Sequence, residues 1–260
     1  MPILSVNNVS VRFGGVVALD GVSFDVEPRQ IVGLIGPNGA GKTTLFNCLS
    51  RLYTPNQGTI TFNGTPLLPL RPHAIAGLGI GRTFQNLALF PRMSVVQNVM
   101  VGMHARTRAG FVSSALRLGW VERENAACLR AALELLGFVG LAALADRPAA
   151  DLPFVTLKRL ELARALASEP SLLLLDEPAG GLNHEEVKEL AALIRRLRDE
   201  RQLTVLLVEH HMGLVMQVSD KVVVLDFGRR IAHGTPAEVQ RDREVLRAYL
   251  GMPESAAENG

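Results

Sequence analysis

The nine residues GPNGAGKTT, numbers 36–44, follow a short apolar run at 31–35 and precede a helix-compatible segment at 45–49. Their spacing fits the pattern G-x-x-x-x-G-K-[ST], in which glycines let the backbone pass close to phosphate oxygens. Successive backbone N–H groups and the N-terminus of the following helix then point at the anion. The stretch therefore predicts a phosphate-binding loop for a nucleoside triphosphate.

Two side chains of this loop have separate expected roles. The Lys42 ammonium should reach the β- and γ-phosphates, and the Thr43 hydroxyl should bind Mg²⁺. The predicted nucleotide-binding residues of the loop are Gly36, Pro37, Asn38, Gly39, Ala40, Gly41, Lys42, Thr43 and Thr44.

A second polar group follows a fully apolar run at 172–175. Asp176 and Glu177 come directly after this run, and open α/β sheets bind ligands at the carboxyl ends of their strands. We expect Asp176 to belong to the Mg²⁺ site and Glu177 to act as the general base toward an attacking water. The phosphate-binding loop in the same chain favours this interpretation over an ordinary strand that ends in a solvated acidic turn.

Composition excludes several other classes of protein. The chain has 260 residues, 48% of them hydrophobic, and a net charge of +2, which argues against a surface that coats nucleic acid. With only Cys48 and Cys128, no disulfide framework or four-cysteine metal site is expected, and a reducing cytosol fits. The longest weakly polar stretch, 131–145, is shorter than the roughly 20 residues that span a bilayer. We expect neither a signal peptide nor a membrane-spanning segment.

Hydrophobic patterning divides the chain into three parts. Strands are expected at 4–13, 16–26 and 58–62, with a hairpin turn at Gly14-Gly15. Helical spacing from 95 to 144 indicates an insertion. The later elements are expected at 157–167 (helix), 185–200 (helix), 203–208 (strand), 221–226 and 229–232 (strand pair), and 236–250 (two short helices).

These parts together predict the fold class. It is α/β: a P-loop NTPase (RecA-like) core with an antiparallel β subdomain and a helical subdomain insertion. We expect one nucleotide-binding domain at 1–240, with the helical insertion at approximately 90–160. Residues 241–260 are expected to form a C-terminal helix and a disordered tail.

The order of the loop at 36–44, Gln85, Asp176-Glu177 and His210 resembles the nucleotide-binding subunits of ABC transporters, over essentially residues 3–250. This resemblance implies that ATP is the nucleotide. It also implies that Gln85 contacts Mg²⁺ and the attacking water, and that His210 contacts the γ-phosphate. Satisfied polar residues near loops are the alternative for both side chains.

An aromatic residue near the first hairpin stacks on adenine in this family, and Phe13 stands at that place. The alternative for Phe13 is a core residue of the hairpin. His211 is an oddity of this chain, because the family often has Asp there.

One segment departs from the family. The family signature Leu-Ser-Gly-Gly-Gln binds the γ-phosphate of ATP held by the opposite subunit, and residues 152–156 here read Leu-Pro-Phe-Val-Thr. Pro153 has neither a hydroxyl nor a backbone N–H, and Val155 brings a branched side chain where close approach is needed. Thr156 would cap the following helix and offer one hydroxyl.

Two readings of the signature segment stay open. In the first, the chain's own site is fully active while its contribution to a partner's site is weakened, which favours a heterodimer. In the second, the backbone still closes on the phosphate.

The segments at 81–86, 208–212 and 234–239 resemble the larger ATP-binding subunit of importers for branched-chain or related amino acids or amides. This resemblance implies a peripheral position on the cytoplasmic face of the inner (plasma) membrane. The implied partners are two transmembrane permease subunits, a second, different ATP-binding subunit and an external solute-binding protein, with no nucleic acid. The alternatives are the ATPase of a lipid or lipopolysaccharide exporter and a weakly hydrolysing regulatory subunit.

Overall fold

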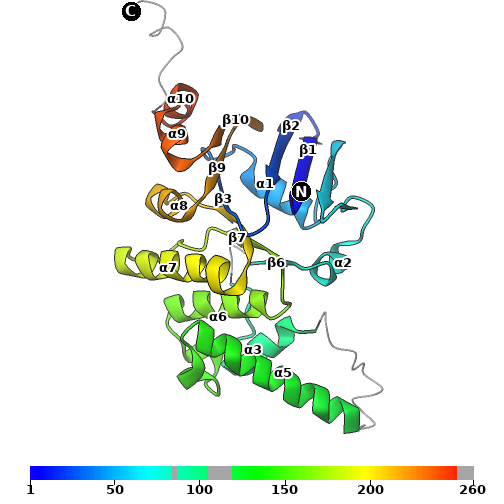
Figure 1. Ribbon diagram of the computed structural model, residues 1–260, viewed down its shortest axis with the longest axis vertical. Helices are drawn as coiled ribbons and strands as arrows, with labels where there is room; N and C mark the ends of the chain where they lie inside the picture. The colour runs from blue at the N-terminus through cyan, green and yellow to red at the C-terminus, as the bar shows by residue number, and fades with distance from the viewer. Residues whose placement is uncertain (84–86, 105–118, 251–260) are drawn as a thin grey trace, which may run out of the picture. The chain divides into compact units, whose positions relative to one another are not determined.

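The computed structural model describes residues 1–83, 87–104 and 119–250 (Figure 1). The chain forms two compact units. The first unit contains residues 1–75 and the chain from 174 onward, and the second contains residues 76–173. The tail expected at the end of 241–260 lies outside the described residues.

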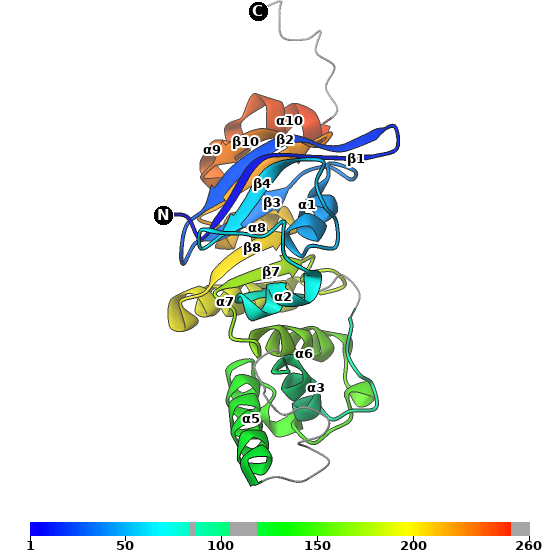
Figure 2. The same ribbon diagram turned by 90° about the vertical axis from the view of Figure 1, so that its right-hand side faces the viewer.

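An antiparallel sheet of the first unit contains the predicted hairpin. Its strand order is β2-β1-β4-β5, and β1, β2 and β4 lie side by side in Figure 2. Phe13 pairs with Val16, so Gly14 and Gly15 form the expected two-residue turn. The strands are β1 (Leu4–Phe13), β2 (Val16–Val26), β4 (Gln57–Phe62) and β5 (Thr65–Pro66).

The second sheet has the order β10-β9-β3-β8-β7, with the short β6 next to β7. β3 pairs in parallel with both β8 and β9. Every residue of β3, β7 and β8 is buried, as expected for continuous apolar strands in a parallel sheet. The strands are β3 (Ile31–Ile35), β6 (Ile80–Arg82), β7 (Leu172–Asp176), β8 (Thr204–Val208), β9 (Lys221–Asp226) and β10 (Arg229–Gly234).

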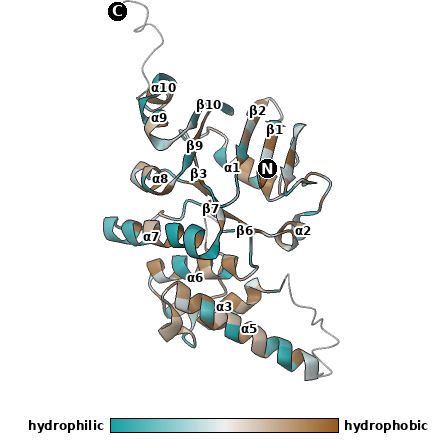
Figure 3. Cartoon of the chain, viewed as in Figure 1, coloured by the Kyte–Doolittle hydropathy of each residue, from teal (hydrophilic) through white to brown (hydrophobic). Residues whose placement is uncertain are grey.

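Helix α7 (His184–Arg201) shows why the sequence forms these helices. Its buried residues Val187, Ala191, Ile194 and Leu197 recur at helical spacing, while most of its remaining length is hydrophilic (Figure 3). The Asn183 side chain caps the first turn in a capping box with Glu186. The other helices of this unit are α1 (Lys42–Leu49), α8 (Met212–Val218), α9 (Pro236–Arg241) and α10 (Arg243–Leu250), and α2 (Pro72–Gly77) spans the point where the chain enters the second unit.

The last two helices pack onto the core next to the phosphate-binding loop. Ile35, the last residue of β3, lies in one buried cluster with Val215 of α8, Val239 of α9 and Val245 of α10. The residue directly before the loop is therefore packed from several elements of the same unit.

The second unit is built around α3, which packs against α5 and α6 (Figures 1 and 2). A capping box of Ser94 and Gln97 starts α3. The buried Asn98 side chain holds the preceding loop, accepting from Phe90 N–H at 2.8 Å. The helices are α3 (Val95–Gly102), α5 (Gly119–Phe138), η1 (Ala142–Leu144), η2 (Ala149–Asp151) and α6 (Phe154–Leu166).

Two expectations about helix starts and extents were wrong. The helix expected at 157–167 begins at Phe154, with Pro153 as the N-cap residue, whose N–H would have no partner within the helix. Thr156 therefore lies inside the first turn of α6 and does not cap it. Helix α8 was not predicted, because its seven residues are too few to show a clear period.

In the described part of the chain, no helix combines the length and apolar character that a membrane crossing requires.

Candidate active site

The phosphate-binding loop leaves the carboxyl end of β3, and two of its glycines have no substitute. A Cβ on Gly36 would lie 2.1 Å from the Leu225 carbonyl oxygen, and one on Gly41 would lie 2.5 Å from that of Ala18. Gly41 also has a φ of +100°, which side chains rarely permit. The surrounding backbone therefore fixes the loop in a conformation that only glycine adopts at these positions.

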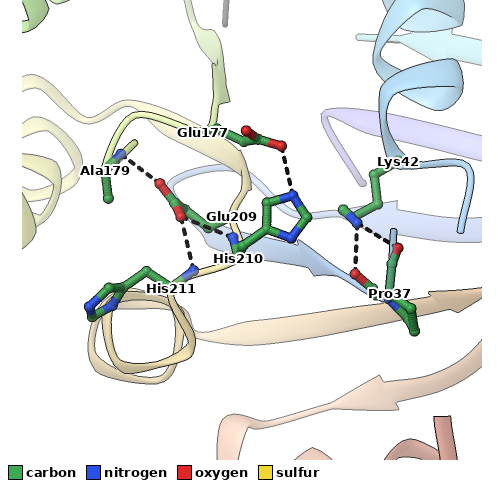
Figure 4. Close-up of polar contacts among 8 residues, drawn as sticks. Pro37, Lys42, Glu177, Ala179, Glu209, His210 and His211 are labelled. Atoms are coloured by element: carbon green, nitrogen blue, oxygen red, sulfur yellow. Dashed lines mark hydrogen bonds and ion pairs between the residues drawn. The ribbon is translucent and has the colours of Figure 1, made fainter. Parts of the chain in front are cut away.

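Lys42 is the first residue of α1 and is only 5% exposed. Its ammonium donates to the carbonyl oxygens of Gly36 at 2.7 Å and Pro37 at 2.9 Å, across the loop (Figure 4). Burial lowers the pKa of Lys42, and the nearby Glu177 carboxylate opposes that effect. The next residue, Thr43, is exposed, so its hydroxyl is accessible at the start of the helix.

The two predicted acids stand at the end of β7. Asp176 is the last residue of the strand and is 4% exposed. Glu177 follows with a φ of +49°, a conformation uncommon for a residue with a Cβ. Its N–H donates to the Val208 carbonyl at 2.9 Å, so the carboxyl ends of β7 and β8 lie side by side.

His210 and Glu177 meet at this edge of the sheet. The His210 Nε2 atom lies 2.7 Å from Glu177 Oε1 (Figure 4). An ionised carboxylate only accepts hydrogen bonds, so Nε2–H is the donor. The side chains remain partly accessible, at 44% for His210 and 22% for Glu177. The first unit thus brings together the loop lysine, the two acids and the histidine that sequence analysis singled out.

These residues fit a magnesium-bound nucleotide. The loop runs into the N-terminus of α1, where backbone N–H groups without a helical partner can receive an anion. Thr43 and Asp176 supply a hydroxyl and a carboxylate, the hard oxygen ligands that Mg²⁺ prefers.

Comparison with known proteins decides the family. A family model described as ABC transporter matches residues 19–180. The chain is also 44% identical over 250 residues to LivG of Escherichia coli (strain K12), named as a high-affinity branched-chain amino acid transport ATP-binding protein. That match covers 96% of this chain and 98% of LivG. The chain belongs to the ABC transporter family.

Further matches agree with this assignment. The ABC ATPase is 43% identical over 250 residues to BraF of Pseudomonas aeruginosa, covering 96% of this chain and 98% of BraF. A second model, for branched-chain amino acid ATP-binding cassette transporters, matches residues 229–251. The ADP conformation of the cassette MJ1267 superposes with a TM-score of 0.83 at 30% identity, covering 97% of this chain and 100% of that one. The expected fold class and ATPase family are confirmed.

The family resemblance implied roles for Phe13 and Gln85, and the structure describes only Phe13. Phe13 is 47% exposed at the end of β1, so it is not a core residue of the hairpin. Its ring meets that of Tyr53 edge to face, with centroids 5.2 Å apart, which leaves part of the ring surface open to a ligand. Gln85 lies outside the described residues.

The signature segment of this ABC ATPase forms the start of α6 in the second unit. Pro153 is the N-cap residue, with a φ of −59°, and Phe154 is 47% exposed in the first turn. The Lys158 ammonium lies 5.6 Å from the centroid of the Phe154 ring. The N-terminus of α6 thus carries an apolar ring and a proline in place of a serine and glycines.

Sequence analysis missed Glu209, the residue directly after β8. Its side chain is 3% exposed and accepts hydrogen bonds from three backbone N–H groups. The available signal was an acid directly after a fully apolar strand, the same signal that identified Asp176. His211 also has an explanation: its Nδ1 accepts from Leu214 N–H at 3.1 Å and caps α8, as an Asp carboxylate would.

Proposed function

We propose that this ABC ATPase powers a membrane importer for branched-chain or related amino acids or amides. The similarity to LivG and BraF over nearly the whole chain supports this proposal, and so does the second family model at 229–251. The proposed partners are two transmembrane permease subunits, a second, different ATP-binding subunit and an external solute-binding protein. The proposed location is peripheral, on the cytoplasmic face of the inner membrane.

The proposed chemistry is attack of water on the γ-phosphorus of ATP, which forms a P–O bond, breaks the bond from the γ-phosphorus to the β–γ bridging oxygen and releases ADP and phosphate. Glu177 accepts a proton from the water, and Lys42 together with the loop amides stabilises the phosphate oxygens. His210 orients the Glu177 carboxylate and contacts the γ-phosphate. The single observation that carries this assignment is the 2.7 Å contact between His210 and Glu177, in the unit that also holds the phosphate-binding loop.

The proposal also assigns the Mg²⁺ ligands, the contact to the adenine ring and the role of the signature segment at 152–156. Thr43, Asp176 and Gln85 would hold Mg²⁺, which offsets the negative charge of the phosphate oxygens when bound. Phe13 would stack on adenine. The proline and the exposed phenylalanine at the start of α6 support a weakened contribution to the partner's site, and therefore a heterodimer.

Glu177→Gln tests the chemistry. The amide keeps the shape of the side chain but cannot accept the water's proton, so turnover should fall by about 100-fold or more. Affinity for Mg·ATP should stay within about threefold, because the loop is untouched. The matched control is Glu185→Gln on the exposed face of α7, which should retain turnover. Wild-type turnover in Glu177→Gln would remove Glu177 as the base.

Transport is tested separately with the purified chain, its permeases and second ATPase in vesicles. Solute-binding protein loaded with leucine should stimulate ATP hydrolysis and drive leucine uptake. If neither branched-chain amino acids nor related amides have an effect, the importer assignment fails while the ATPase chemistry stands.

A further inference from the structure

The buried carboxylate of Glu209 has no place in the chemistry proposed above. Burying a charge is costly unless hydrogen bonds replace the lost water. Three backbone N–H groups do so here: Oε1 accepts from Ala179 at 2.6 Å, and Oε2 accepts from His210 at 3.0 Å and His211 at 3.1 Å (Figure 4). The carboxylate therefore ties the segment after β8 to the segment after β7.

The Glu209 carboxylate lies just beyond the last backbone hydrogen bond between the ends of β7 and β8. Glu177 N–H still donates to the Val208 carbonyl at 2.9 Å. Glu209 follows Val208 directly, and its side chain accepts the next hydrogen bond between the two segments, from Ala179, two residues beyond Glu177. The carboxylate thus bridges the two backbone segments that carry Glu177 and His210.

We propose that Glu209 is a positioning residue for ATP hydrolysis, which sets the distance between the Glu177 carboxylate and the His210 ring. The inference rests on the proposed roles of those two residues. The backbone that carries the His210 ring is held through the His210 N–H, which donates to Glu209, and the backbone beyond Glu177 is held at Ala179. Because both ends share one carboxylate, movement of either segment changes the 2.7 Å contact.

The chemistry of the link explains why a neutral side chain would not replace it. An amide has one accepting oxygen, and its NH₂ group would face N–H donors. Glu209→Gln therefore keeps either the Ala179 bond or the bonds to His210 and His211. Glu209→Asp keeps the charge, but its side chain is one CH₂ shorter and cannot reach both sides.

The test uses the assembled transporter with Glu209→Gln, Glu209→Asp and the control Glu238→Gln. Glu238 also accepts a backbone N–H, from Thr235 at 2.7 Å, but at the start of α9. Turnover number, KM for ATP, nucleotide affinity and thermal unfolding are measured for each variant. Misplacement of reacting groups by about 1 Å costs up to about 100-fold in rate. Glu209→Gln should therefore lower kcat about 10- to 100-fold, with KM and nucleotide affinity within about twofold of wild type.

The outcomes separate positioning from simple stability. Glu209→Asp should show an intermediate kcat, and Glu238→Gln a wild-type kcat even if its melting temperature falls equally. If Glu209→Gln cannot be purified, Glu209→Asp decides alone: wild-type kcat contradicts the inference. Wild-type kcat in Glu209→Gln, or a loss matched by Glu238→Gln, would also overturn it. If Glu177→Gln keeps full turnover, the proposed chemistry fails instead.

Discussion

Helices α1 and α6 both begin at a segment that the family uses for phosphate, yet the two starts are built differently. α1 follows a glycine loop whose Gly41 is the N-cap residue, in a left-handed conformation. α6 follows Pro153 and opens with the half-exposed Phe154. Any helix N-terminus offers N–H groups and a partial positive charge, so this common feature does not separate the two sites.

The difference lies in what surrounds those N–H groups. At α1, the buried Lys42 ammonium supplies a positive charge, and Gly41 lets the chain enter the helix in a left-handed conformation. At α6, a proline removes one N–H, and an aromatic ring occupies the first turn. The start of α1 thus combines glycines with a buried cation, whereas α6 opens without glycines and its Lys158 is only partly buried.

The largest expected effect concerns the two lysines at these helix starts. Lys42→Ala should lower turnover about 100-fold or more, because it removes a charge that stabilises the transferring phosphoryl group. Lys158→Ala on α6 is the matched control and should leave the chain's own site within about twofold of wild type. Steady-state hydrolysis by the assembled complex measures both. Equal losses of turnover in the two variants would contradict the proposed difference between the starts of α1 and α6.

The two cysteines differ in burial: Cys48 of α1 is buried and Cys128 of α5 is partly exposed. Burial raises the pKa of Cys48 from 9.0 to about 11, so its thiolate is about 100-fold rarer below pH 9. Alkylation of Cys48 by iodoacetamide at pH 8.5 should therefore be at least about 100-fold slower in the folded protein than in urea. The rate should rise as the pH approaches 11.

Cys128 is partly exposed and serves as the internal control, followed by mass spectrometry of the same sample. It should react in the folded protein at pH 8.5. Rapid labelling of Cys48 there would show that α1 is more open than the structure indicates.

Restoring the family signature at 153–155 tests whether these residues weaken the start of α6. The triple variant Pro153→Ser, Phe154→Gly and Val155→Gly returns a hydroxyl and a backbone N–H, each a potential hydrogen bond to a charged phosphate. Added glycines in the helix cost about 1 kcal/mol each and limit the gain. Turnover at the partner's site should rise roughly tenfold, while the chain's own site should not change. No change at the partner's site would support the reading in which the backbone already closes on the phosphate.

The smallest expected effect tests ordinary helix capping in each unit. Asn183 caps α7 and Ser94 caps α3, each through a complete capping box. Asn183→Ala and Ser94→Ala should each lower the free energy of unfolding by about 1 kcal/mol, measured by urea denaturation. Losses near zero would mean that the Glu186 and Gln97 side chains alone satisfy those helix starts.

Much of the candidate site could be proposed from the sequence because its signals are local. The loop at 36–44 needs glycines at fixed spacing, and Asp176 follows an apolar strand, so both are visible without any partner in space. The hairpin was equally accessible, because its two glycines fix the register between Phe13 and Val16.

The rest depends either on contacts between distant residues or on local capping that residue preferences do not indicate. The Glu209 carboxylate accepts a hydrogen bond from Ala179, 30 positions away, and no spacing pattern in the sequence predicts that bond. Thr156 was expected to cap a helix because threonine favours caps, but Pro153 starts the helix three residues earlier. His211 caps α8 through a ring nitrogen, a use of histidine that propensity tables do not suggest.

The central prediction is an asymmetry between the starts of α1 and α6. The direct measurement is ATP turnover at each composite site of the complex with the second ATPase, with hydrolysis blocked at one site at a time. We expect the site built on Lys42 and Glu177 of this chain to turn over ATP several-fold faster than the site that uses its residues 152–156. Equal rates at the two sites would contradict the account.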